Sequence, residues 1–280
     1  MIFELAIGLG LAILLIAFLA EYIDSTLGMG YGTTLTPILL LLGFEPLQVV
    51  PAILLSESLT GVFAGLMHHK VKNVDFRPKT MNPYRIFEAT QQLGIAETFE
   101  RGLPRHLKVA LLIAFCSIFG SLFAVFVAVN IPAFYLKLYI GLLVLVIGIV
   151  ILATLNKEYG FSWKKITGLS LIASFNKGMS GGGYGPVVTG GQLLSGVDGK
   201  NAIGITSLAE GLTCIVAVIA YLYTNSIIDW ILAPYLVTGA VLSVPFAAIS
   251  VKKIDTKKFK VIVGVATLVL GVFTLWKVLV

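Results

Sequence analysis

The chain has 280 residues, of which 58% are hydrophobic and 12% are charged, and its mean hydropathy is +0.97. Soluble domains carry about 25% charged residues, so this composition argues against a soluble enzyme or a soluble binding domain. The formal net charge is +6, but the distribution of the basic residues, described below, argues against nucleic-acid binding as its cause.

The first predicted element is the apolar run Ile2–Ile23. A cleaved signal peptide would begin with basic residues and end at small ones. This run instead has Glu4 near its start and Glu21 and Asp24 near its end. We therefore interpret the run as a helix of the folded protein.

A glycine-rich segment, Gly28–Gly32, follows this run and precedes the short apolar run Thr36–Leu42. Threonine is a good N-cap residue, and proline is favoured at the first helical position. Thr36-Pro37 therefore predicts a helix start. Gly185-Pro186, which follows a second glycine-rich segment, predicts another.

Six longer apolar runs approach the ~20 residues that a helix needs to cross a bilayer. They lack the polar face that a helix of a soluble bundle would carry. The sequence therefore predicts an all-α polytopic membrane protein. The runs are Pro46–Met67, Leu107–Val129, Phe134–Leu155, Asn201–Tyr223, Ile231–Ile249 and Phe259–Leu279.

The chain contains an internal repeat. A shift of 153 residues superimposes Gly28–Gly32 on Gly181–Gly185. The same shift carries Glu57 to Glu210 without a gap. A glycine-rich break and a glutamate deep in an apolar run have therefore been duplicated together.

The two copies differ in length, because matches later in the repeats need a shift of 123 residues instead of 153. The first copy thus carries about 30 extra residues, which we assign to 77–106. This insert is either a surface elaboration or a regulatory element, and its polar stretch Tyr84–Arg101 is a candidate cytoplasmic helix.

The charges of the loops predict the topology of the repeats. Cytoplasmic loops of membrane proteins carry an excess of Lys and Arg. Basic residues are concentrated in His68–Lys108, Lys157–Lys165 and Lys252–Lys260, whereas Asn130–Ala133 and Thr224–Asp229 contain none. The basic loops are therefore predicted to be cytoplasmic.

Two short apolar pieces, Ile166–Phe175 and Pro186–Leu194, lie between a basic loop and a base-free loop. At ~1.5 Å per residue each piece is too short to cross a ~30 Å core, so we predict a re-entrant hairpin. Each repeat, 1–155 and 156–280, then has one re-entrant helical hairpin and three transmembrane helices. An odd number of crossings inverts the second repeat relative to the first. The protein is predicted to lie in the cell (inner) membrane, with both termini on its outer side.

Non-helical backbone inside hydrocarbon is tolerated only where protein or a water-filled cavity satisfies its polar groups. The helix start after each glycine segment would present free N–H groups and a positive dipole end, which favour an anion. The alternative is that the glycines only allow close helix packing. The candidate substrate-binding residues are Gly30, Tyr31, Gly32, Thr33, Thr36, Asn176, Lys177, Gly182, Gly183, Tyr184, Gly185 and Gln192.

Glu57 and Glu210 lie near the middle of predicted spans, where a carboxylate must be paired, protonated or hydrated. In one interpretation they exchange protons. In the other they bind an amide or tyrosine of a glycine break and hold it in shape. Thr206 and Ser207 lie on the same predicted helix face as Glu210 and share these two interpretations.

Opposite charges occupy equivalent positions of the two repeats, because the shift of 153 residues carries Asp24 to Lys177. Two arrangements remain open for this pair. Asp24 and Lys177 form a central salt bridge, or Lys177 contacts a bound anion together with Asn176.

These features resemble the TauE/SafE sulfite exporter family. The resemblance covers essentially the whole chain and rests on Gly28–Gly32 with Thr36-Pro37, on Leu42–Pro46 and on Ser180–Pro186. It implies a secondary transporter of a small anion, such as sulfite, a sulfonate or another organosulfur anion. Transport would proceed by alternating access, with protons as a candidate coupling ion.

A cation-coupled transporter, with the two glutamates as the ion site, is the alternative. A membrane enzyme is disfavoured because no metal cluster or nucleophile–base pair is expected near the membrane centre. The three histidines, His68, His69 and His106, are expected in cytoplasmic loops. The sequence predicts no metal, no cofactor and no nucleic-acid partner, and membrane lipid is the expected surrounding.

Overall fold

The computed structural model describes residues 7–78, 80, 82, 84, 87, 91–92, 101–154, 162–193, 197–224, 228–251, 253 and 256–280. The regular structure in these parts of the chain is helical, and they contain no strand. The stretch Tyr84–Arg101, expected as a cytoplasmic helix, lies largely outside the described residues. The helices are α1 (Ile7–Leu27), α2 (Tyr31–Leu41), α3 (Pro46–Lys70), α5 (Arg105–Asn130), α6 (Ala133–Ala153), α7 (Trp163–Ser180), α8 (Gly185–Leu193), α9 (Gly199–Tyr223), α10 (Ala233–Ser250) and α11 (Thr256–Leu279).

Six helices are long and apolar enough to cross a membrane, namely α1, α3, α5, α6, α9 and α10. Five of them match predicted spans. The sixth is α1, which was expected as one arm of a hairpin and is counted from Gly8 to Leu27. The last predicted span, Phe259–Leu279, corresponds to α11, of which Gly264–Leu279 qualifies only as a shorter apolar helix.

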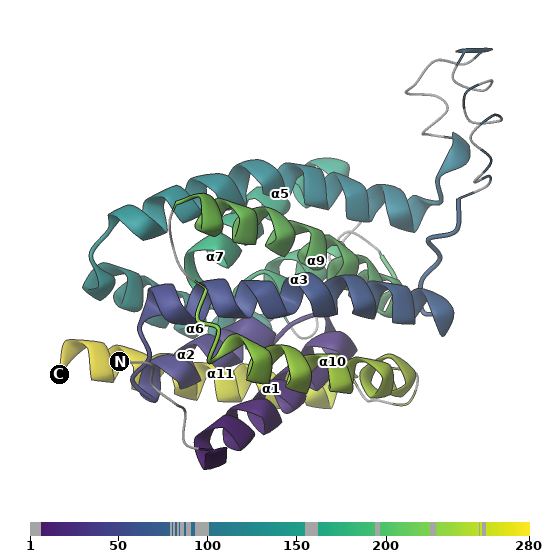
Figure 1. The fold of residues 1–280 in the computed structure, drawn as a ribbon. Helices are drawn as coiled ribbons and strands as arrows, with labels where there is room; N and C mark the ends of the chain where they lie inside the picture. The colour runs from purple at the N-terminus through teal and green to yellow at the C-terminus, as the bar shows by residue number, and fades with distance from the viewer. Residues whose placement is uncertain are drawn as a thin grey trace.

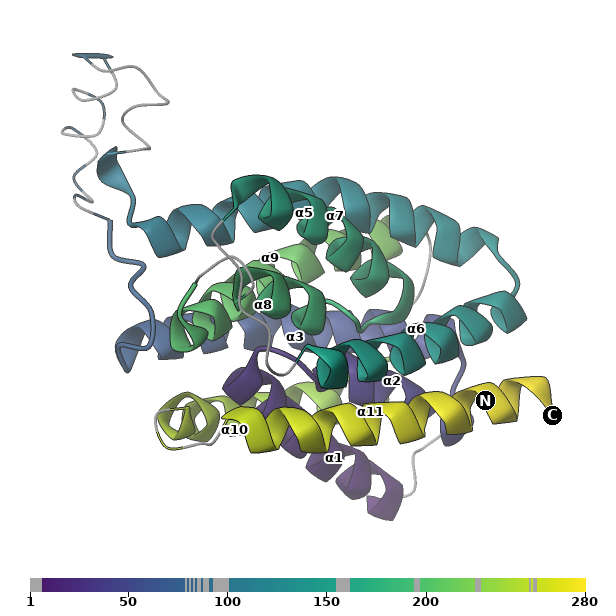
Figure 2. The same ribbon diagram turned by 180° about the vertical axis from the view of Figure 1, so that it is seen from behind.

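The helices pack in pairs that join distant parts of the chain (Figure 1). Helix α1 packs along α10, α5 along α7, and α6 along α11. Helix α3 packs against α9 and lies between the group of α5, α7 and α9 and the group of α1, α10 and α11 (Figure 1). The short helix α8, seen from behind in Figure 2, packs against α7 and α9, and α2 packs against α11, α1 and α3. The two short helices α2 and α8 are thus enclosed by longer ones.

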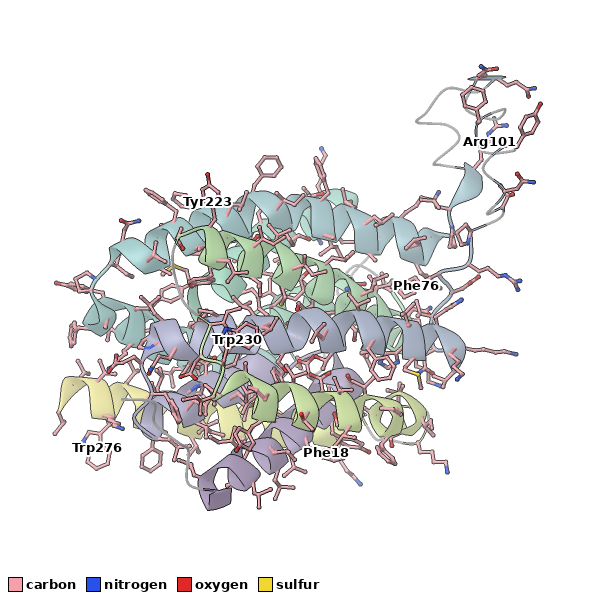
Figure 3. All side chains as sticks on the ribbon, in the orientation of Figure 1. Phe18, Phe76, Arg101, Tyr223, Trp230 and Trp276 are labelled. Carbon is pink, nitrogen blue, oxygen red and sulfur yellow. The ribbon has the colours of Figure 1, made fainter. Side chains whose placement is uncertain are left out.

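Large apolar side chains project from the outside of the bundle (Figure 3). On α5, Phe115, Phe119, Phe123 and Phe126 are each 61–63% exposed. Residues three and four apart share one face of a helix, so these rings form a continuous apolar stripe. A soluble protein seldom exposes so large an apolar surface, and this one fits contact with lipid.

Helices α3 and α9 approach so closely that their backbones touch at two glycines. A Cβ atom on Gly61 would lie 2.7 Å from the Gly211 Cα atom, so no larger residue fits there without a shift. Gly61 lies one turn after Glu57, and Gly211 directly follows Glu210. This close approach therefore brings the two buried glutamates to the same level of the bundle.

The start of α8 agrees with the sequence, because the helix begins at Gly185 with Pro186 next. The predicted start at Thr36-Pro37 is wrong. Helix α2 begins at Tyr31, and Pro37 lies inside it. The preceding residue, Gly30, has φ of 135° and caps the helix, a conformation open to glycine but not to other residues. A proline within a helix removes one backbone bond, and α2 tolerates that loss.

Candidate functional site

The two glycine breaks pack directly against each other at the centre of the protein. A Cβ atom on Gly32 would collide with the carbonyl of Gly181, and one on Gly182 would lie 2.7 Å from the Thr33 nitrogen. The Gly183 N–H donates a hydrogen bond of 3.1 Å to Thr33 Oγ1. The glycines therefore have the packing role that was one of the two interpretations.

Two threonines link the halves of the chain, because the hydroxyl of each donates a hydrogen bond to a backbone carbonyl at the glycine break of the other half. Thr36 Oγ1 donates to the Ser180 carbonyl at 2.8 Å, and Thr189 Oγ1 donates to the Gly28 carbonyl at 2.7 Å. Thr36 and Thr189 are equivalent in the two repeats. These bonds satisfy carbonyls that the helix breaks leave without helical partners.

The tyrosine within each glycine break joins a short helix to a long one. The Tyr31 hydroxyl lies 2.7 Å from Ser56 Oγ and joins α2 to α3. The Tyr184 hydroxyl lies 3.2 Å from Thr213 Oγ1 and joins α8 to α9. Both tyrosines are completely buried, so they fix the short helices rather than line an open passage.

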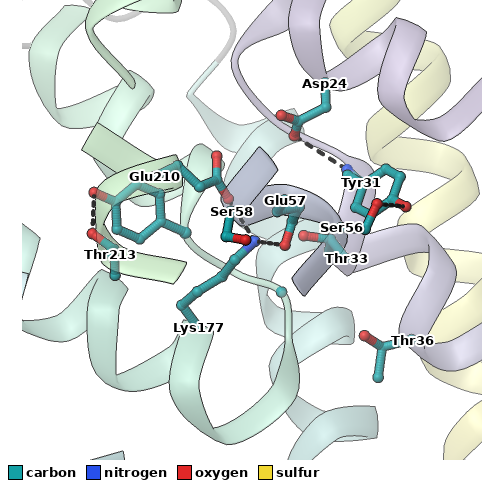
Figure 4. A network of polar contacts seen from close by, with 12 residues as sticks. Asp24, Tyr31, Thr33, Thr36, Ser56, Glu57, Ser58, Lys177, Glu210 and Thr213 are labelled. Carbon is teal, nitrogen blue, oxygen red and sulfur yellow. Dashed lines mark hydrogen bonds and ion pairs between the residues drawn. The ribbon is translucent and has the colours of Figure 1, made fainter. Parts of the chain in front are cut away.

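A carboxylate already occupies the N-terminus of α2. The Tyr31 N–H, the first of that helix, donates a hydrogen bond of 3.1 Å to Asp24 Oδ1 (Figure 4). Negative groups are stabilised at this end of a helix. The anion-binding position predicted from the sequence is therefore filled in this conformation by a side chain of the protein itself.

Lys177 lies between the two buried glutamates (Figure 4). Its Nζ atom lies 2.6 Å from Glu210 Oε1 and forms a second ion pair with Glu57 Oε2. The three residues are at most 3% exposed. Of the two arrangements left open for Asp24 and Lys177, the salt bridge is not formed in this conformation, because the lysine binds the glutamates and Asp24 accepts from the Tyr31 N–H.

The glutamates also differ from the structural role weighed for them. Neither Glu57 nor Glu210 has a hydrogen bond to a glycine-break amide or tyrosine among the described residues; their described partner is Lys177. Glu57 Oε1 is buried and has no hydrogen-bond partner in the described part of the chain.

A small cavity of about 10 Å³ lies beside this ion pair. A cavity needs about that much space to hold one water molecule. Four carboxylates face it, against the single positive charge of Lys177, and the lining residues come from α1, α3 and α9. They are Glu21, Asp24, Glu57, Thr60, Gly61, Ala64, Ser207 and Glu210.

Glu21 was not among the candidate site residues predicted from the sequence. The first apolar run was predicted to end at Ile23, whereas α1 extends to Leu27. Glu21 is 2% exposed and precedes Asp24 by three residues, which places the two on one face of the helix. That spacing, next to a glycine break, was the signal available in the sequence.

Gln192 and Thr206 form a separate polar group between α8 and α9. Thr206 Oγ1 accepts a hydrogen bond from Gln192 Nε2 at 2.8 Å and lies 2.9 Å from Thr189 Oγ1, whose own hydrogen is donated to the Gly28 carbonyl. Ser207 lines the cavity while its hydroxyl donates to the Ile203 carbonyl at 3.1 Å. The candidate residues on α9 therefore divide between two places.

Asn176 points away from the neighbouring Lys177 cluster. Its Oδ1 atom accepts a hydrogen bond of 2.8 Å from the Tyr139 hydroxyl of α6. The expected joint contact of Asn176 and Lys177 with one anion is therefore not formed in this conformation.

The three histidines do not lie in loops, where they were expected. His68 and His69 belong to the last turn of α3, and His106 to the first turn of α5, instead of to loops. His68 is fully buried, and its Nε2 atom lies 2.9 Å from the Ser25 carbonyl. Among the described residues, no group of His, Cys, Asp and Glu is arranged to hold a metal ion.

Comparison with known proteins gives two matches. A family model described as "Sulfite exporter TauE/SafE" matches residues 13–81 and 89–274. The chain is also similar to a Bacillus subtilis (strain 168) protein named "Probable membrane transporter protein YtnM". The two are 27% identical over 262 residues, which cover 89% of this chain and 77% of the relative. No solved structure matches the chain.

Proposed function

Because the chain belongs to the sulfite exporter TauE/SafE family, we propose that this multi-pass membrane transporter is a secondary transporter of a small anion. Sulfite, a sulfonate or another organosulfur anion is the expected substrate class. The family description names sulfite, and the relative's name describes a membrane transporter without a substrate. The family description supports the class of cargo, the relative's name supports membrane transport, and the individual anion is left to experiment.

The proposed architecture is a pair of inverted repeats, 1–155 and 156–280, that exchange access to the two sides of the cell membrane. The packing of equivalent helices supports it. Helix α1 packs on α10 as α7 packs on α5, and α3 packs on its own counterpart α9. Rocking of one repeat against the other around a fixed site is the usual consequence of such a design.

The ion pairs of Lys177 carry the proposed mechanism. A lysine bound by two buried carboxylates is not free to attract an anion. A proton on Glu57 or Glu210 would neutralise one partner and leave Lys177 with less compensating charge. Lys177 could then bind an anion beside the breaks. Proton binding and anion binding would in this way favour each other, which is the requirement for coupled transport.

Substrate binding can be tested first with the purified protein. Its thermal unfolding would be measured with sulfite, sulfate, thiosulfate, taurine, sulfoacetate and a carboxylate such as acetate. A ligand at about 100 times its Kd stabilises the folded protein by about 2.7 kcal/mol, so the substrate should raise the unfolding temperature while acetate should not. Stabilisation by none of the sulfur anions contradicts the proposal.

Transport can be tested in proteoliposomes loaded with the stabilising anion. An imposed pH gradient should drive its net movement, and a matched membrane potential without a pH gradient should drive less. The matched control is Lys137→Met, because Lys137 pairs with the exposed Glu45 far from the cavity. An anion flux that does not depend on the pH gradient would contradict proton coupling but not anion transport.

A cation-coupled transporter remains the second candidate, and the four carboxylates around one cavity favour it. Such a cavity attracts positive charge whether the cation is a proton or a metal ion. Replacing sodium by choline at constant pH separates the two. Transport that falls in choline supports a sodium site, and unchanged transport supports the proton.

A further inference from the structure

Glu21 differs from the other carboxylates of the cavity in having no charged partner. Its Oε1 atom accepts a hydrogen bond of 2.7 Å from Ser25, and its Oε2 atom lies 3.3 Å from Thr60 Oγ1. No lysine, arginine or histidine forms an ion pair with it among the described residues. The repeat shift carries Glu21 to Ser174, so the second half of the chain has no equivalent acid.

The hydrogen bonds of Thr60 are compatible with a proton on Glu21. Its hydroxyl carries one hydrogen and has two neighbours, the Ser56 carbonyl at 3.1 Å and Glu21 Oε2 at 3.3 Å. A carbonyl oxygen can only accept. When Thr60 donates to the nearer Ser56 carbonyl, a protonated Glu21 can donate its own hydrogen to Thr60 Oγ1. A protonated Glu21 therefore fits the hydrogen bonds of this set, and the choice between its two states depends on the surrounding charges.

The surrounding charges favour the same state. Asp24 accepts a hydrogen bond from the first N–H of α2, and Glu57 and Glu210 both form ion pairs with Lys177. These carboxylates of α1, α3 and α9 all raise the cost of a further negative charge beside them. Among the described residues, the other titratable side chains close to Glu21 are the buried Tyr31 hydroxyl of α2 and the His68 imidazole of α3, whose Nε2 lies 2.9 Å from the carbonyl of Ser25. On α10, which packs along α1, the titratable side chain is Tyr235, which lies beside Gly10, about three helical turns from Glu21.

We propose that Glu21 is the proton-binding residue of this cavity and that Glu57 receives its proton. Both residues line the same cavity. Glu57 is 2% exposed, and its Oε1 atom has no hydrogen-bond partner among the described residues. In this step the O–H bond of Glu21 breaks and one forms on Glu57, so Glu21 becomes the anion and Glu57 becomes neutral. Lys177 loses one of its two ion pairs. The proposal rests on the anion-transport function above and adds the path of its coupling proton.

The first experiment reads the proton without transport. Infrared absorption of the purified protein reports the C=O stretch of protonated carboxyl groups. Glu21→Gln should remove one such band, and Glu45→Gln, an exposed acid that pairs with Lys137, should remove none. Thr60→Val should shift the same band, because the Glu21 O–H loses its acceptor. A spectrum that neither Glu21→Gln nor Thr60→Val changes overturns the proposal.

The second experiment measures coupling as the ratio of anion uptake with and without a pH gradient. Glu21→Gln should bring this ratio to one, whereas Glu45→Gln should keep the wild-type ratio. A wild-type ratio in Glu21→Gln overturns the role of Glu21. If the wild-type protein moves no anion, the proposed function fails, and the infrared band still decides whether Glu21 holds a proton. If Glu21→Gln does not fold, Thr60→Val decides the same question.

Discussion

Glu57 and Glu210, equivalent acids of the two repeats, bind the same ammonium group. Lys177 Nζ lies 2.6 Å from Glu210 Oε1 and also pairs with Glu57 Oε2. The backbone contact between Gly61 and Gly211 holds α3 and α9 close enough for this. Three groups thus share two negative charges and one positive charge away from water, and the stability of the protein should depend on that balance.

Lys177→Met should therefore destabilise the protein strongly. Removing one partner of a buried ion pair costs about 3–5 kcal/mol, because the remaining charge is left uncompensated. Here two carboxylates lose their cation. Thermal unfolding in detergent should move to clearly lower temperature, with reduced yield of monodisperse protein.

The control restores the charge balance. The triple variant Lys177→Met, Glu57→Leu and Glu210→Leu removes all three charges and should recover most of the lost stability, since a buried ion cluster can be replaced by apolar residues of similar volume at little cost. If Lys177→Met unfolds at the wild-type temperature, the cluster does not stabilise the fold.

The contact between the two glycine breaks should tolerate no side chain. In Gly32→Ala the added methyl group would collide with the Gly181 carbonyl. Overpacking of this kind typically costs about 1–3 kcal/mol, and backbone cannot rotate away as a side chain can. Gly190→Ala in α8 is the matched control, because nothing lies within 4 Å of its Cβ position. Equal unfolding temperatures for the two variants would contradict the close contact.

The equivalent tyrosines should respond differently to loss of their hydroxyl groups. Tyr31→Phe leaves Ser56 Oγ without its described partner, whereas Tyr184→Phe leaves Thr213 with its bond to the Ala209 carbonyl. An unsatisfied buried group costs about 1–3 kcal/mol, more than the ~1 kcal/mol of an ordinary lost bond. Thermal unfolding should therefore fall further for Tyr31→Phe. The reverse order would contradict this assignment of partners.

Much of the helical architecture follows from local sequence, because apolar length and glycine or proline positions determine where helices cross and break. Gly185-Pro186 was correctly predicted to start a helix. Thr36-Pro37 was not, because a break is fixed by positive φ at Gly30, and φ is not visible in a sequence. Proline alone marks a helix start only where an earlier residue has not already begun the helix.

The partners in the site could not be predicted from the repeat. Alignment of the halves compares Asp24 with Lys177, but equivalence in a repeat does not imply contact. The ion pairs depend on how α3 crosses α9, which is a property of tertiary packing. Glu57 and Glu210 were conspicuous in apolar runs, whereas Glu21 lay near the expected end of one and escaped notice.

Asp24→Asn should increase the affinity of the protein for its anion. The Asp24 carboxylate accepts the first N–H of α2 and therefore competes with any anion for that helix end. Asparagine keeps an oxygen acceptor for the Tyr31 N–H and removes the negative charge. Under the proposed function, Kd for sulfite, measured by thermal shift or calorimetry, should fall about tenfold, which corresponds to ~1.4 kcal/mol. Asp24→Ala is the control, since it removes the acceptor as well and should also lower stability. An Asp24→Asn protein that binds sulfite no more tightly than the wild type would exclude competition at this helix end.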